Sequence, residues 1–123
     1  MIGFLALAFA QAASVDQAKV GEHVAAIEEK MAEWDGGLLK REGNVVCQTR
    51  KSSGDEAADA ICCAAMLQCY APYTARLDAI AESDAPIEER RAQMQAIGEK
   101  VKPCIASSSA KAVQRLAEYR AAR

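Results

Sequence analysis

Five cysteines constrain this chain more than any other feature of its sequence. They are Cys47, Cys62, Cys63, Cys69 and Cys104. Three of them fall within residues 62–69, with one cysteine before this stretch and one after it. In an oxidising compartment such cysteines usually form structural disulfides, whereas in a reducing one they remain thiols. The compartment therefore decides how the cysteines are interpreted.

The first twelve residues predict export. Residues 2–9 form an uncharged apolar run, which is followed by the overlapping small-residue sites Ala8-Phe9-Ala10 and Ala10-Gln11-Ala12. This pattern is typical of a secretory signal peptide, and the run is too short to cross a bilayer as a helix. No basic residue precedes the run, and the alternative is a buried apolar first turn. We predict a signal peptide over residues 1–12 and a periplasmic or secreted domain, without stable membrane insertion, over residues 13–123.

The composition favours helices. The chain has 27 alanines but 7 valines, 7 isoleucines and 2 threonines, so its apolar content comes mostly from the strongest helix former. A total of 123 residues suits one domain. Near the start, apolar residues alternate at spacings of four and three, which predicts a long amphipathic helix: Val20, Val24, Ile27, Met31, Trp34 and Leu38. The pair Gly36-Gly37 leaves open whether this helix ends near Asp35.

The rest of the chain predicts further helices joined by short connections. Residues 43–54 read as a loop that carries Cys47. A second helix is expected from Asp55, with a kink or break at residues 70–72, where Pro72 removes a backbone hydrogen bond. A third helix is expected to start within residues 83–89 and to kink or break at residues 102–103, before a final helix over residues 105–123. The predicted fold is all-α, a small antiparallel bundle of three to four helices stapled by disulfides.

Helical geometry limits the cysteine pairing. In a continuous second helix, the three clustered cysteines cannot bond to one another, because neighbours point ~100° apart and residues seven apart are separated by ~10.5 Å. Cys47 and Cys104 must then each bond to one of the three, which leaves one free thiol. A turn near Asp84 places residue 104 level with about residue 64, because equal counts give equal rise. Cys104 is therefore expected to pair with Cys62 or Cys63.

A second interpretation of the cysteines is metal binding. Cys62, Met66 and Cys69 are spaced so that they share one face of the second helix. Thiolate and thioether sulfurs are ligands that Cu(I) prefers, so this face in a reduced form indicates, as the alternative function, a soft-metal binding or carrier protein. The same spacing is also typical of core packing.

The sequence offers little for other chemistry. It contains no glycine-rich phosphate loop, no nucleophile elbow and no zinc-ligand spacing, and His23 is its only histidine. A net charge of -2 provides no basic footprint for nucleic acid. We therefore expect an exported binding or interaction protein that is not an enzyme, uses no cofactor and binds no nucleic acid. Another protein and a second copy of the chain are both candidate partners.

Overall fold

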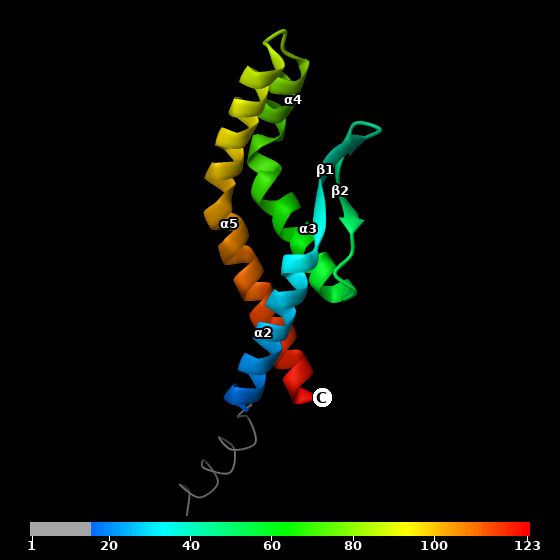
Figure 1. Cartoon of the computed structure of the whole chain (residues 1–123), viewed down its shortest axis with the longest axis vertical. Helices are drawn as coiled ribbons and strands as arrows, with labels where there is room; N and C mark the ends of the chain where they lie inside the picture. The colour runs from blue at the N-terminus through cyan, green and yellow to red at the C-terminus, as the bar shows by residue number, and fades with distance from the viewer. Residues whose placement is uncertain (1–15) are drawn as a thin grey trace, which may run out of the picture.

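A computed structural model describes residues 16–123, and the predicted signal peptide over residues 1–12 lies outside this part (Figure 1). The elements in chain order are α2 (Gln17–Glu33), β1 (Asp35–Arg41), β2 (Asn44–Lys51), α3 (Glu56–Tyr70), the 3-10 segment η1 (Ala71–Tyr73), α4 (Thr74–Glu82) and α5 (Ile87–Ala122). The described part is mostly helical, as predicted. The antiparallel pair β1-β2 corrects the all-α assignment. Within this part, no helix combines the length and the apolar character needed to span a membrane.

The first helix ends close to Asp35, which is the earlier of the two ends that the sequence left open. α2 ends at Glu33, and Trp34 already has an extended backbone with ψ 137°. Glu42 and Gly43 then adopt φ values of 54° and 82°, which is the pair of left-handed residues that a two-residue type I′ hairpin turn requires. Leu38 therefore belongs to a strand, although its spacing also fits the helix.

The predicted loop over residues 43–54 is also corrected, because residues 44–51 form β2. The β-branched Val45 and Val46 favour the extended conformation. Cys47 in the same strand is covalently bonded to α3. The local preference of the valines and the covalent bond to α3 are therefore both consistent with a strand at this point.

The second half of the chain follows the prediction more closely. Asp55 is the N-cap of α3, and the expected break at Pro72 is present as η1 between α3 and α4. α5 begins directly after Pro86. Pro103, however, lies inside α5, and the separate final helix is not formed. Val101 and Ile105 pack on either side of this proline, so burial holds the helix together where one hydrogen bond is lost. Figure 1 shows α5 bending near its middle.

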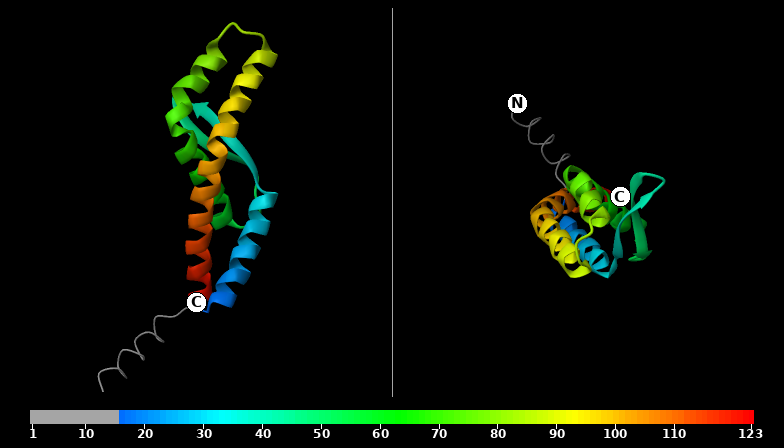
Figure 2. Two further views of the ribbon diagram at one scale, coloured as in Figure 1. Left: turned by 90° about the vertical axis from the view of Figure 1, so that its left-hand side faces the viewer. Right: turned by 90° about the horizontal axis from the view of Figure 1, so that it is seen from above.

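α5 is the longest helix of the described part and packs against α2, α3 and α4. Its N-terminal half runs beside α4 and its C-terminal half beside α2 (Figure 2). One buried cluster joins α5 to α2 and α3 through Val20, Ile27, Ala58, Val113 and Ala117. A second cluster joins α5 to α3 through Cys69, Ile97 and Val101, with Tyr73 of η1 and Leu77 and Ile80 of α4 packed against it. The hairpin stands outside both clusters, next to α3 and α4.

Candidate functional site

Two disulfides tie other elements to α3. Cys47 of β2 bonds to Cys63 with an S–S distance of 2.02 Å, and Cys104 of α5 bonds to Cys69 at 2.01 Å. Cys62 is the free cysteine. Two bridges and one free thiol agree with the sequence prediction. The hairpin and the middle of α5 are thus held covalently on different sides of one helix.

The pairing of Cys104 corrects the expectation that it bonds to Cys62 or Cys63. Equal counting assumed two uniform α-helices that meet near residue 84. The segment η1 instead rises by ~2.0 Å per residue where an α-helix rises by ~1.5 Å, and the connection to α5 runs on to Pro86. Because of both departures, Cys104 lies level with a residue that is closer to Cys69 than residue 64 is. Cys63 also points toward the hairpin, where it is bonded to Cys47 and is therefore not available to Cys104.

The predicted soft-metal face is not assembled in this structure. Cys69 is bonded to Cys104, so of the three expected ligands only Cys62 and Met66 carry sulfurs outside a disulfide. Burial, together with the negative charge of Asp59, raises the pKa of the Cys62 thiol and disfavours the thiolate that binds metals. Over residues 16–123, no group of three or more His, Cys, Asp or Glu side chains is placed to hold a metal ion.

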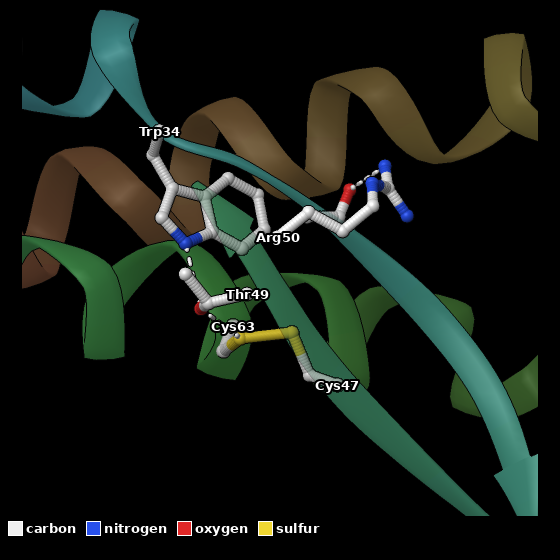
Figure 3. The surroundings of a disulfide bond; sticks show 6 residues. Trp34, Cys47, Thr49, Arg50 and Cys63 are labelled. Atoms are coloured by element: carbon white, nitrogen blue, oxygen red, sulfur yellow. Dashed lines mark hydrogen bonds between the residues drawn. A yellow bond between two sulfur atoms is a disulfide. The ribbon is translucent and has the colours of Figure 1, made fainter. Parts of the chain in front are cut away.

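Polar contacts fix the base of the hairpin against α3 (Figure 3). The Trp34 indole Nε1 donates a hydrogen bond to Thr49 Oγ1 at 2.9 Å, and this hydroxyl lies 3.8 Å from Cys63 Sγ. Across the two strands, Arg50 pairs with Asp35 at 3.1 Å, and its guanidinium lowers the pKa of that carboxyl. The Thr49–Cys63 contact and the disulfide join the base of the hairpin to α3, and the Arg50–Asp35 pair joins its two strands.

A groove lies between the hairpin and the helices α4 and α5, and we name it the hairpin groove. Its volume is about 330 Å³. Side chains from four elements line it: Leu38, Leu39, Lys40, Val45, Thr74, Leu77, Asp78, Ala81 and Met94. Most of these are apolar, and apolar lining with a few polar groups is typical of ligand sites. Sequence reasoning missed the groove, because its residues come from segments that no local pattern connects.

The polar groups of the hairpin groove are already engaged. Lys40 Nζ of β1 lies 2.8 Å from Asp78 Oδ2 of α4, and this carboxylate raises the pKa of Lys40. The Thr74 hydroxyl donates to the Ala71 carbonyl at 3.2 Å. The ion pair ties the two walls of the groove together and neutralises its charge. What remains for a ligand is an apolar surface.

A larger hollow on α5 is a weaker candidate. Its volume is about 860 Å³, and Tyr70 is the one lining residue that lies outside α5. A site lined by one helix does not bring side chains together from several directions, which ligand recognition requires. The hairpin groove does so, and it is therefore the candidate functional site.

Comparisons with protein-family models, with curated proteins and with solved structures found no match to this chain.

Proposed function

We propose that this chain is an exported, non-catalytic binding protein that holds its ligand in the hairpin groove. The observation that carries the proposal is an apolar groove of about 330 Å³ whose walls are tied by the Cys47–Cys63 disulfide and by the Lys40–Asp78 ion pair. Ligand sites typically occupy ~300 to 1,000 Å³ and are largely formed before the ligand arrives. Both ties favour a groove that exists in the free protein.

The engaged polar groups favour binding over catalysis. A general acid, base or nucleophile must have its reactive atom directed at the substrate. In the groove, Lys40 and Asp78 are directed at each other, and the Thr74 hydroxyl is directed at the Ala71 carbonyl of η1. The lining therefore suits the uptake of an uncharged aliphatic group better than a chemical step.

A titration of the isotope-labelled protein with N-acetyl-leucine methylamide tests the groove. This probe carries one aliphatic side chain between two peptide groups. We expect NMR shift changes at the methyl groups of Leu38, Leu77 and Met94, and loss of the Leu38 and Met94 changes in Leu77→Arg. Because Leu77 also packs against the second buried cluster, circular dichroism checks that this variant keeps the wild-type fold. The matched control is Leu67→Arg, which places the same charge on α3 at a side chain that is 38% exposed and lies outside the groove. Changes that fall elsewhere, or that survive Leu77→Arg, contradict the proposal.

Export rests on the signal-peptide pattern and on the two disulfides, which are typical of oxidising compartments. The test is expression of the full chain in a bacterium, followed by fractionation and intact mass. We expect periplasmic protein that lacks residues 1–12 and contains two disulfides. Cytosolic protein that keeps these residues and has five reduced thiols would contradict export.

A further inference from the structure

We propose that the occupant of the hairpin groove is an extended polypeptide segment, which pairs with β1 as a third strand and inserts an aliphatic side chain between β1 and α4. This inference rests on the proposed function and specifies its ligand. It follows from the backbone of β1, from the position of the groove and from the chemistry of its lining.

The backbone of β1 presents unpaired hydrogen-bonding groups. Opposed residues in an antiparallel hairpin alternate between hydrogen-bonded and non-hydrogen-bonded pairs. Arg41 and Asn44 flank the two-residue turn and form a bonded pair, so Lys40 and Leu38 belong to non-bonded pairs. Their N–H and C=O groups therefore point away from β2. Within residues 16–123, these groups have no backbone partner on the outer side of β1.

The groove follows this open edge. Leu38, Leu39 and Lys40 are consecutive, and all three line the groove. Successive side chains of a strand point to opposite faces, so a groove that contacts three in a row reaches the strand edge as well as one face. Figure 1 shows β1 lying between β2 and α4. The unpaired groups of β1 are therefore next to the space in which a ligand would lie.

The chemistry of the lining selects the kind of segment. Exposed strand edges are usually protected by charged side chains or by covering elements. Here the Lys40 ammonium forms an ion pair with Asp78 of α4, 2.8 Å away. Its charge is therefore directed toward α4 and does not protect the strand edge. Leu38, Leu77 and Met94 supply an apolar wall. In strand addition, main-chain hydrogen bonds provide affinity and a pocket for alternate side chains provides specificity. β1 offers unpaired main-chain groups for the first, and the hairpin groove offers a pocket for the second.

The first experiment selects a probe. A phage-displayed library of short random peptides is selected on the wild-type protein, with counter-selection on Leu77→Arg. We expect enriched peptides with aliphatic or β-branched residues at alternate positions, since alternate side chains of a strand enter the groove. The best peptide is then synthesised for affinity measurements.

The second experiment compares Lys40→Pro with Lys40→Ala. Both substitutions remove the ion pair with Asp78, but only proline also removes the outward N–H. This N–H makes no bond to β2, and proline is tolerated at such edge positions. We expect Lys40→Ala, which loses the tie between the groove walls, to bind the peptide more weakly than the wild type, and Lys40→Pro to bind it roughly ten-fold more weakly than Lys40→Ala. Circular dichroism and Trp34 fluorescence check that both variants fold.

N-methylation of the peptide gives a readout that does not depend on a protein variant. Methylation at alternate amides is expected to abolish binding where the amide faces β1 and to leave it intact at the amides between. Equal affinity for Lys40→Pro and Lys40→Ala, or an N-methyl scan without alternation, would overturn strand pairing while the groove remains a binding site. Shifts with the leucine probe but no enriched peptide would also overturn it. If neither probe binds, the proposed function fails as well.

Discussion

At the scale of single residues, Asp55 links the start of α3 to the last turns of α5. Its Oδ1 accepts hydrogen bonds from the amides of Ala57 and Ala58, which caps α3. The Arg120 guanidinium donates to both carboxylate oxygens at 2.9 and 3.0 Å, which ties the start of α3 to the last turns of α5. The bonds from Arg120 and from the two amides lower the pKa of Asp55 to about 2. They favour the charged carboxylate of the folded state.

We predict that Asp55→Asn destabilises the protein by roughly 2 kcal/mol at neutral pH, because asparagine keeps the cap but loses the charged pair with Arg120. The pKa of Asp55 is lower in the folded than in the unfolded protein, so its stabilisation is complete above pH ~4 and is lost as the pH falls toward ~2. Urea unfolding across this range is the measurement. Asp16→Asn is the control, since the Asp16 carboxylate caps α2 by accepting from the backbone amides of Ala18 and Lys19. Equal losses in both variants would contradict the role of Arg120.

Cys62 provides a second prediction at this scale. Because burial raises the pKa of its thiol, alkylation of the native protein at neutral pH is expected to be slower than in urea. Titration with a thiol reagent should find one thiol per chain in the wild type and none in Cys62→Ser, each with two disulfides by intact mass. More than one reactive thiol in the non-reduced protein would contradict the pairing.

At the scale of elements, the starts of α3 and α5 could be predicted and the hairpin could not. The start of α3 has a capping Asp55 with acidic residues in its first turn, and α5 starts after Pro86, both of which are local signals. The hairpin, in contrast, depends on tertiary contacts. Gly36 resembles a helix stop, but its role is close approach, since a Cβ there would collide with the Trp34 indole and with the Gln48 carbonyl. The available signal was Glu42-Gly43 between apolar runs, which is weaker than the usual Asn-Gly turn.

The disulfide Cys47–Cys63 determines where the hairpin lies. We predict that the double variant Cys47→Ala/Cys63→Ala loses ~3 kcal/mol, the entropy expected for a loop that closes over a separation of 16 residues. A two-stranded hairpin is marginal alone, so amide exchange should accelerate in β1 and β2 while the helices keep their protection. Hydrogen exchange followed by NMR measures this difference. The control is Cys69→Ala/Cys104→Ala, which should loosen α3 against α5. Unchanged protection in the hairpin would mean that its noncovalent contacts, among them the Trp34 hydrogen bond and the Lys40–Asp78 ion pair, hold it without the disulfide.

At the scale of the whole molecule, α5 contributes residues to both apolar clusters. Val113 and Ala117 of α5 belong to the cluster with α2, and Ile97 and Val101 belong to the cluster with α3 and α4. The sequence did not predict that one helix would join the two clusters, because Pro103, which lies between the two sets of residues, suggested a helix break there. The hairpin groove was missed for a related reason, since its lining comes from elements that lie far apart in the sequence. Leu38, Leu77 and Met94 meet because the disulfide Cys47–Cys63 holds the hairpin on α3 while α5 packs beside α4.

The continuity of α5 predicts that the two clusters unfold together. Ile27 and Ile97 are 0% and 1% exposed and lie in different clusters. Ile27→Val and Ile97→Val should each cost ~0.5 to 1.5 kcal/mol, because each removes one buried methyl group. Their effects should add within ~0.5 kcal/mol in the double variant, since the sites share no partners, and all three proteins should unfold in a single transition. Urea unfolding followed by Trp34 fluorescence and by circular dichroism measures both properties. Separate transitions by the two probes, with each substitution moving only one of them, would mean that α5 breaks at Pro103 and that its two halves unfold independently.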